Sequence, residues 1–299
     1  MGSYKNLLFI INKHSGRRYV PGIKEKIHHI CAQYNAVCVV EFTQKRNHAC
    51  QLAREAAGRF DAIIAVGGDG TVNETARGLL HSATPMGIIP TGSGNGLARH
   101  LGIPMNCPAA ARLIFNSVPV NIDTFTVNGQ TGVNVAGLGF DGHVAGLFSA
   151  RTKRGLWGYT ALIIRDFLHY QPVPVTARMQ GHTITSNLFI LAIANSSQYG
   201  NKASIAPSAS LTDHYLNLVQ VKKIPLLHIP PFVFRLFTRK LSNNRYYSCT
   251  PCRSANIELP HPVPYHIDGE ACGRARRFEI RIQPSSLRVL IPAHRMEKI

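Results

Sequence analysis

The feature that most constrains the fold is a buried strand that leads into a glycine-rich turn and then a helix. Residues 62–66 read Ala-Ile-Ile-Ala-Val, Gly67-Gly68-Asp69-Gly70-Thr71 follow, and residues 72–80 have a helical pattern. Glycine lets the backbone turn sharply and approach a ligand closely. The N-terminus of a helix offers unpaired N–H groups and a positive dipole to phosphate. Taken alone, the segment favours a simpler interpretation, a tight turn in which Asp69 only caps the helix.

A second glycine-rich turn in the next strand–helix unit changes this interpretation. A strand at residues 87–89 is followed by Thr91-Gly92-Ser93-Gly94-Asn95-Gly96. Two such turns in neighbouring units would enclose one polyphosphate from two sides. A carboxylate beside phosphates should repel them unless it binds Mg²⁺ or accepts a proton from an attacking hydroxyl, so Asp69 gains a chemical role.

The first part of the chain alternates strand and helix patterns. This rhythm predicts an α/β domain over residues 1–121 with a mostly parallel sheet, whose ligands bind beyond the carboxyl ends of its strands. The expected strands are residues 7–11, 36–42, 62–66 and 87–89, and the expected helices are residues 24–34, 48–57 and 72–80.

The pattern changes near residue 122, where alternating or apolar runs separated by turn residues begin. We expect an antiparallel, β-rich second domain over residues 122–299, whose last residues are able to return to the first domain. Its expected strands are residues 123–127, 173–179, 183–193, 216–221 and 278–282, with helices at 155–170 and 228–240.

The charge of the chain indicates an anionic partner. Thirty-three Lys and Arg face 15 Asp and Glu, which gives a formal net charge of +18. The basic residues are scattered in pairs and match no nucleic-acid motif, so no nucleic acid is expected. Peripheral contact with an anionic membrane is the expectation instead. With no apolar stretch of about 20 residues and no secretory signal, we expect a cytoplasmic protein at the inner membrane face. A homodimer is compatible with the sequence.

Three glycine-flanked segments carry several of the few acids. They contain Asp69, Asp141, and Asp268 with Glu270. Acids in such turns are candidates for metal or proton chemistry. For Asp268-Gly269, a two-residue hairpin turn is an equally good explanation.

Four segments together resemble the diacylglycerol kinase catalytic-domain family, which includes bacterial lipid kinases and sphingosine kinases. They are residues 66–74, 90–98, 137–142 and 268–270, in the family's order across nearly the whole chain. The resemblance implies an NAD-kinase-like α/β domain, a C-terminal β-sandwich domain, and ATP with Mg²⁺ in the cleft between them.

The resemblance also implies roles for individual residues. Glu270 is the expected general base, and Asp69 the second catalytic carboxylate. A loop at residues 206–215 would hold a structural Mg²⁺ through Asp213 and the main-chain oxygens of Ser210 and Tyr215. The expected nucleotide contacts are Asn12, Thr43, Gly67, Gly68, Asp69, Gly70, Thr71, Val72, Asn73 and Ser93.

Two residues depart from the family pattern, and the second of them leaves the acceptor lipid open. Lys13 stands where the family usually has proline, and Gly96 where bacterial members commonly have aspartate. The sequence therefore predicts an ATP-dependent lipid kinase that acts on a lipid hydroxyl of the diacylglycerol or sphingoid-base class. The alternatives are a soluble-substrate kinase of the NAD kinase type and a non-enzymatic basic membrane- or nucleic-acid-binding protein.

One apolar segment has two interpretations. Residues 224–237 are rich in large apolar side chains and are followed by Arg239 and Lys240. The segment is either a core helix under the β-rich domain, which is favoured, or a lipid-entry or membrane-docking element.

Overall fold

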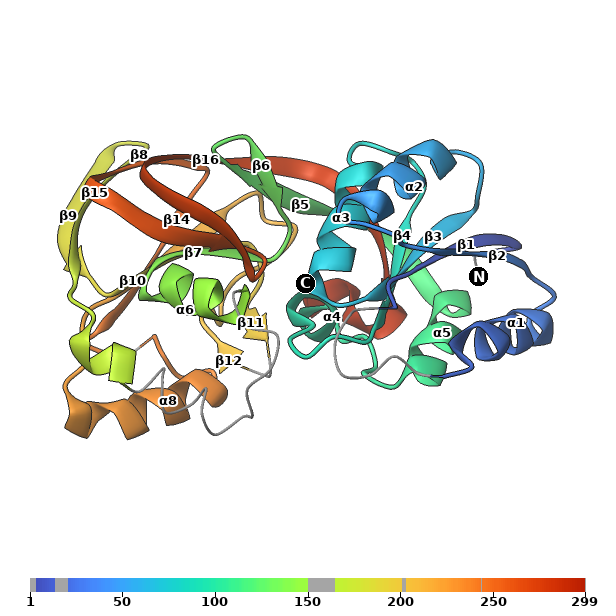
Figure 1. The fold of residues 1–299 in the computed structure, drawn as a ribbon, viewed down its shortest axis with the longest axis horizontal. Coiled ribbons are helices and arrows are strands. Elements are labelled where there is room, and N and C mark those ends of the chain that lie inside the picture. Colours follow the sequence, from blue (N-terminus) through green and yellow to red (C-terminus); the bar gives the residue numbers. More distant parts are fainter. Residues whose placement is uncertain (1–3, 14–20, 150–164, 201–202, 243, 299) are drawn as a thin grey trace.

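The computed structural model describes residues 4–13, 21–149, 165–200, 203–242 and 244–298, which form two lobes side by side (Figure 1). The first lobe is α/β, and the second consists mainly of antiparallel strands. Both predicted fold classes are confirmed.

The first lobe is built on four parallel strands in the order β2-β1-β3-β4. The inner strands β1 (Asn6–Ile11), β3 (Ala62–Gly67) and β4 (Met86–Pro90) are almost wholly buried, while β2 (Val37–Phe42) forms the edge. Continuous apolar runs are expected of parallel strands that helices cover on both faces. These helices are α1 (Ile23–Gln33), α2 (His48–Ala56), α3 (Asp69–Leu79), α4 (Gly96–His100) and α5 (Cys107–Phe115).

Helix α3 begins at Asp69, three residues earlier than the periodicity of apolar residues predicts. Gly68 precedes it in an extended conformation, and its carbonyl accepts the N–H of Val72 at 3.0 Å. The glycine-rich turn is therefore largely the first turn of the helix itself, and Asp69 lies in that turn.

The second lobe consists mainly of antiparallel strands, with several helical segments packed on it. Its strands are β6 (Gln130–Gly132), β7 (Val135–Gly139), β8 (Val173–Met179), β9 (His182–Leu188), β10 (Ile190–Ala194), β11 (Gln198–Gly200), β12 (Ala203–Ser204), β13 (Leu216–Val221), β14 (Tyr247–Cys252) and β15 (Ser254–Ile267). The helical segments include α6 (Phe140–Ser149) and α8 (Ile229–Phe237), with the short 3-10 turn η1 (Leu226–His228), and residues 165–169 are also helical. The C-terminal 3-10 turn η2 (Ala293–Lys298) lies against the first lobe, where the Arg295 side chain donates to the His100 carbonyl at 2.7 Å.

The single strand predicted at residues 183–193 is wrong, because the chain breaks at Phe189 into β9 and β10. The backbone N–H of Phe189 donates to the Val221 carbonyl at 2.8 Å, and the Phe189 carbonyl accepts the backbone N–H of Phe140 at 3.0 Å. The Phe189 and Phe140 rings are stacked, with their centroids 4.7 Å apart. Of the helix predicted at 155–170, residues 165–169 are helical, and residues 155–164 lie outside the described part of the chain.

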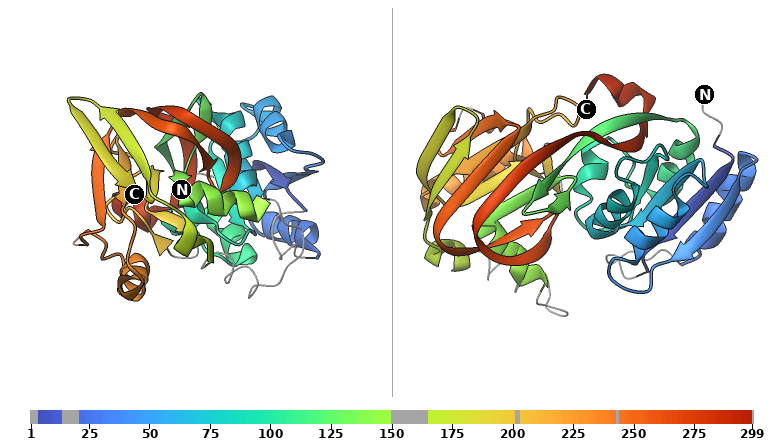
Figure 2. Two further views of the ribbon diagram at one scale, coloured as in Figure 1. Left: turned by 60° about the vertical axis from the view of Figure 1, so that its left-hand side comes forward. Right: turned by 90° about the horizontal axis from the view of Figure 1, so that it is seen from above.

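Two long strands run through both lobes. They are β5 (Ser117–Val127) and β16 (Glu270–Pro292), which pair antiparallel with each other, and Val289 of β16 also pairs with Met86 of β4. Figure 2 shows them sweeping from one lobe to the other. The predicted domain boundary at residue 121 falls inside β5, so the chain crosses between lobes within a paired strand.

Candidate active site

The loops that carry the predicted nucleotide contacts meet at one edge of the parallel sheet. Asn12 follows β1, Thr43 follows β2, Gly68 follows β3 and Thr91 follows β4. Since parallel strands end at the same edge, residues far apart in the sequence gather there. Asn12 reaches along this edge and donates its Nδ2 to Thr71 Oγ1 at 3.1 Å.

Two adjoining cavities open at this edge. The larger, about 590 Å³, is lined by both glycine-rich turns and, from the second lobe, by Tyr199, Gly200 and residues 268–270. The other, about 510 Å³, is lined by Asn12, residues 43–46, Glu74 and residues 269–271. Both cavities therefore have walls from the two lobes, and Glu270 lines both.

Asp69 links the two glycine-rich turns through hydrogen bonds. Its Oδ2 accepts the N–H of Asn95 at 2.9 Å, and its Oδ1 accepts the N–H of Gly96 at 2.8 Å. Burial raises the pKa of Asp69, and the two N–H groups partly oppose that rise. Asp69 therefore does not cap its own helix but fixes the loop that precedes α4.

The close approach of the two turns requires glycine. A Cβ at Gly92 would lie 2.6 Å from the Cα of Gly68, and one at Gly94 would lie 2.7 Å from Asp69 Oδ2. Gly67 accepts the backbone N–H of Thr91 at 2.9 Å. The glycines thus allow the two turns to pack closely against each other.

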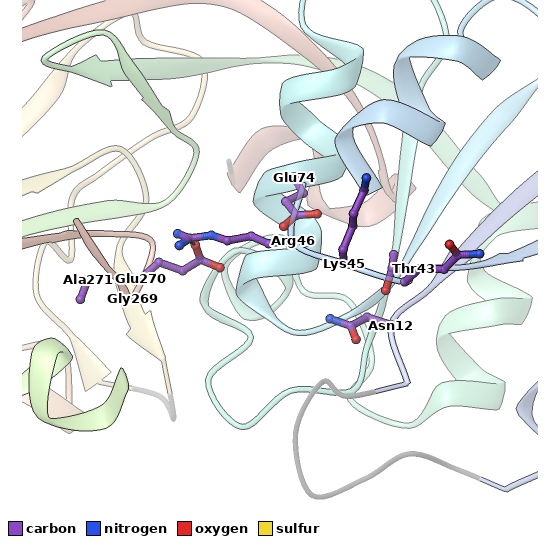
Figure 3. Close-up of a pocket in the computed structure, with 9 residues that line it drawn as sticks. Asn12, Thr43, Lys45, Arg46, Glu74, Gly269, Glu270 and Ala271 are labelled. Carbon is purple, nitrogen blue, oxygen red and sulfur yellow. Dashed lines mark hydrogen bonds and ion pairs between the residues drawn. The ribbon is translucent and has the colours of Figure 1, made fainter. Parts of the chain in front are cut away.

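Glu270 comes from the second lobe on a tight hairpin. Asp268 and Gly269, with φ of 51° and 85°, form the two-residue turn between β15 and β16, and this conformation is typical of a type I′ hairpin. The Glu270 carboxylate reaches the first turn of α3, where a Cβ on Gly70 would overlap it. It also forms an ion pair with Arg46 at 3.0 Å, across the space between the lobes (Figure 3).

Asp268 is buried and fixes this hairpin. Its carboxylate accepts the Asn73 side-chain N–H at 2.7 Å and the backbone N–H groups of Val133, Asn134 and Val135 at 2.8–3.0 Å. Burial raises the pKa of Asp268, and these four donors oppose the rise. Asp268 therefore links helix α3 of the first lobe to the start of β7 in the second.

Asp141, the remaining glycine-flanked acid, is paired with a buried histidine. His266 Nε2 lies 2.8 Å from Asp141 Oδ2, beside a cavity of about 250 Å³ that Asp268 and Gly269 also line. Burial alone would lower the pKa of His266, but the Asp141 carboxylate and the nearby Asp268 carboxylate together outweigh it, and the pKa is raised.

The structure brings most of the predicted site residues together. Those that line the larger cavity are Asn12, Gly68, Asp69, Gly70, Thr71, Ser93 and Glu270, and Thr43 lines the adjoining one. Gly67 ends β3 behind the turn, and the Val72 side chain is buried in the core. The Asn73 side chain turns towards the second lobe, where it also donates to Thr131 O at 3.0 Å.

The predicted metal residues lie on a separate loop and line neither cavity. Asp213 Oδ1 accepts the Tyr215 N–H at 2.9 Å, and buried Asp123 holds the loop through the His214 N–H at 2.8 Å. The pKa of Asp213 is raised, mainly by burial and further by the nearby Asp123 carboxylate. Among the described residues no group of three or more His, Cys, Asp or Glu side chains could hold a metal ion, so a cation on this loop would depend on main-chain oxygens together with Asp213.

Sequence reasoning missed several residues that line the two cavities. Lys45, Arg46 and Glu74 are among them, and Glu74 accepts the N–H groups of Asn47 and Ala49 at 2.8 and 3.2 Å. Lys45 and Arg46 follow β2 just as the recognised turns follow β3 and β4, and this position is a signal that could have revealed them. Tyr199 and Gly200 reach the cavity only through the packing of the second lobe and have no local signal.

Comparison with known proteins agrees with this architecture. Residues 6–127 match the diacylglycerol kinase catalytic domain, and residues 134–291 match the YegS C-terminal NAD kinase beta sandwich-like domain. The chain belongs to the diacylglycerol kinase family of YegS type. It is therefore a member of a family of lipid kinases.

Its relatives have similar lengths. A protein named probable lipid kinase YegS-like from Chromohalobacter salexigens is 29% identical, over 92% of this chain and 88% of that protein. The diacylglycerol kinase of Bacillus subtilis is 30% identical, over 75% and 76%. A crystal structure of a diacylglycerol kinase from Bacillus anthracis superposes with a TM-score of 0.77 and 21% identity, over 98% and 99%, which shows the shared fold.

None of the described helices has both the length and the hydrophobicity that crossing a bilayer requires.

Proposed function

We propose that this protein transfers the γ-phosphate of ATP to a lipid hydroxyl of the diacylglycerol or sphingoid-base class. The observation that carries the proposal is the position of Glu270. Its carboxylate comes from the second lobe and lies against the first turn of α3, where Glu270 lines both the larger cavity and the adjoining one.

The residues present suit a bound nucleotide. The N-terminus of the 11-residue helix α3 opens on the larger cavity, where its N–H groups and dipole favour phosphate. Lys45 adds a positive charge to the adjoining cavity, which Asn12, Thr43 and Arg46, the partner of Glu270, also line. Mg²⁺ bound with the nucleotide would neutralise charge on the phosphates, and Asp69, which lines the larger cavity, is a candidate ligand for it.

Glu270 is the proposed general base. Its partner Arg46 belongs to the nucleotide-binding lobe, so the ion pair holds the carboxylate towards the site, while the Arg46 and Glu270 side chains stay 73% and 45% exposed. An exposed pair of this kind adds little to stability. Its role here is to position the carboxylate, which accepts the proton of the acceptor hydroxyl as that oxygen attacks phosphorus.

Asp69 is proposed to act as an organiser. Both of its oxygens are already engaged with N–H groups of the second turn, although each has a further lone pair for a metal ion. On the separate loop, we propose that Asp213 with the main-chain oxygens of Ser210 and Tyr215 holds a structural Mg²⁺.

Labelled ATP and a panel of acceptors test the proposal. The purified protein is incubated with [γ-³²P]ATP, Mg²⁺ and mixed micelles of diacylglycerol, sphingoid base, ceramide or phosphatidylglycerol, and with soluble NAD. We expect a labelled lipid with the wild-type protein, and about a hundredfold less with Glu270→Gln at unchanged nucleotide affinity. Label on NAD alone would replace the lipid acceptor with a soluble one, and no labelled product would reject the kinase activity.

A further inference from the structure

Helix α8 exposes an unusual amount of apolar surface. Phe232 is its only buried residue, so the favoured core-helix interpretation of residues 224–237 is wrong for most of the segment. The exposed fractions of its large apolar side chains, with those of the preceding turn η1, are Leu226 62%, Leu227 87%, Val233 41%, Phe234 66% and Phe237 51%.

These side chains form a group, whereas other exposed apolar residues in the described chain are scattered. Val37 and Val39 lie on edge strand β2, and Leu168, Tyr215 and Met296 lie elsewhere. Singly exposed apolar residues are ordinary, but a contiguous apolar patch marks a surface that another molecule or a membrane covers. We call residues 226–237 the apolar ridge.

The ridge lies in the most basic part of the chain. Residues 214–257 contain seven Lys and Arg and no Asp or Glu. Lys222 lies exposed before the ridge, and Arg239 and Lys240 lie exposed directly after it. Apolar side chains flanked by cations are the pattern of a helix that lies in the interface of an anionic bilayer.

The positive charge of the protein favours a membrane over a second copy of the chain as the partner that covers the apolar ridge. Two copies, each with a formal charge of +18, would bring like charges together at a ridge flanked only by cations. An anionic lipid surface complements both the apolar side chains and the flanking charges. The occupant that fits this surface is therefore a bilayer.

The ridge is joined to the wall of the candidate site. Phe232 belongs to a buried cluster with Ile205 and Leu241, next to β12. Strand β12 pairs with β11, whose Tyr199 and Gly200 line the larger cavity. Figure 1 shows α8 below β11 and β12, at the outer side of the second lobe.

We propose that the apolar ridge, with Lys222 and Lys240, docks the protein onto anionic membranes. Leu227, Phe234 and Phe237 enter the headgroup–acyl boundary, and the lysines contact the anionic headgroups. This proposal rests on the proposed function for its purpose, since a lipid acceptor resides in the bilayer, but the docking itself needs neither ATP nor turnover.

Vesicle flotation without nucleotide tests the docking. The full-length protein is mixed with vesicles of phosphatidylcholine alone or with 30% phosphatidylglycerol. We expect binding to the anionic vesicles, and at least about tenfold weaker binding for Phe234→Glu/Phe237→Glu. Lys222→Gln/Lys240→Gln should weaken binding more at low salt than at high salt, because salt screens exposed charges.

The matched control is Val37→Glu/Val39→Glu, which places the same two charges at apolar residues 68% and 39% exposed on the other lobe. It should bind vesicles like the wild type, and circular dichroism should confirm that every variant is folded. Unchanged vesicle binding by Phe234→Glu/Phe237→Glu would overturn the proposal. So would a wild-type dimer that this variant converts to a monomer in sedimentation velocity, since the occupant would then be a second copy. Because the assay omits ATP, its failure is distinct from failure of the proposed kinase activity.

Discussion

Asp69 makes two hydrogen bonds that its amide counterpart cannot reproduce. Asn at this position would keep one acceptor oxygen but place an NH₂ group against the backbone N–H of Asn95 or Gly96. We expect Asp69→Asn to lower kcat by about a hundredfold or more, because the second glycine-rich turn shifts from its place beside α3. The thermal midpoint should fall modestly, since one lost charged hydrogen bond costs about 1–3 kcal/mol.

Steady-state kinetics and thermal denaturation of Asp69→Asn check this expectation together. Asp61→Asn is a suitable comparison, because Asp61 also accepts two backbone N–H groups, from Lys5 and Asn6, but lies outside both cavities. Both of these N–H groups donate to Oδ2, so an amide oxygen at position 61 can keep both bonds, and Asp61→Asn should leave kcat and the thermal midpoint nearly unchanged. Equal kcat for Asp69→Asn and the wild type would remove Asp69 from the site.

The titration of His100 should make the stability of the protein depend on pH. It is buried, and burial followed by the Arg295 and Arg239 charges lowers its pKa to about 4. Its Nδ1 accepts the backbone N–H of Ser197 at 3.1 Å, which requires an unprotonated nitrogen. The unfolded chain, with a histidine pKa near 6.5, therefore takes up a proton at a higher pH than the folded protein.

Above pH 6.5, His100 is neutral in both the folded and the unfolded chain and does not reduce stability. As pH falls from 6.5 towards 4, the free energy of unfolding decreases by at most about 1.4 kcal/mol per pH unit, because only the unfolded chain takes up the proton. Urea denaturation at pH 7.5, 6.0 and 5.0 measures this slope. In His100→Gln the slope should be shallower over this range, whatever the variant's stability at pH 7.5. Parallel slopes for the two proteins would show that His100 does not titrate in this way.

The glycine-flanked acids show where residue-level prediction stops. Asp69, Asp141 and Asp268 have similar local sequences, yet one organises a turn, one pairs with His266 and one joins the lobes. The hydrogen-bond partners of these carboxylates lie far away in sequence, so only tertiary packing assigns the roles. The Asp268-Gly269 hairpin, in contrast, was predictable because its conformation depends on two adjacent residues.

Among whole elements, the parallel strands were the most predictable. Continuous apolar runs such as residues 62–66 have the length and composition of buried strands, and the structure places β3 there. The break between β9 and β10 was not predictable, because Phe189 is as apolar as its neighbours. Packing against Phe140 and hydrogen bonding to Val221 decide it.

The contact between α3 and the β15–β16 hairpin gives a test at the level of elements. Gly70 lies in the first turn of α3, and a methyl group there would overlap the Glu270 carboxylate. Gly70→Ala should stabilise the helix by up to about 1 kcal/mol through propensity. We nevertheless expect kcat to fall about 10- to 100-fold, because Glu270 is displaced from the site.

Gly146→Ala is the matched control for this substitution. Gly146 also lies in a helix, α6, and a Cβ there would meet no atom within 4 Å. It should leave kcat unchanged and raise stability by about 0.5–1 kcal/mol. Full activity in Gly70→Ala would mean that Glu270 does not act from its position beside α3.

In the whole molecule, the two lobes share strands rather than a linker. The change of pattern near residue 122 revealed two kinds of architecture, but it could not show that β5 and β16 are continuous across both. Ile122, Leu287 and Val289 pack in the core of the first lobe, while Phe125 and Ile280 of the same two strands pack in the core of the second. Because these strands continue through both lobes, they fix the orientation of one lobe relative to the other, and with it the position of Glu270 relative to α3.

Asp268 is the residue through which this coupling can be tested. Its carboxylate accepts four hydrogen bonds, one from Asn73 of α3 and three from residues 133–135 at the start of β7. In Asp268→Asn an NH₂ group faces some of these donors, and buried donors are left without an acceptor. We expect a loss of about 3 kcal/mol or more in the free energy of unfolding.

Because the strands continue through both lobes, that loss should appear in both. Urea denaturation measures its size, and hydrogen exchange should become faster in β3 of the first lobe and in β13 of the second together. Glu258→Gln, which removes a half-exposed carboxylate paired with Arg178 and Arg277, should change stability by less than about 0.5 kcal/mol. Faster exchange confined to β13 would show that the second lobe unfolds alone, and that the active site is held by the hairpin contact rather than by the continuous strands.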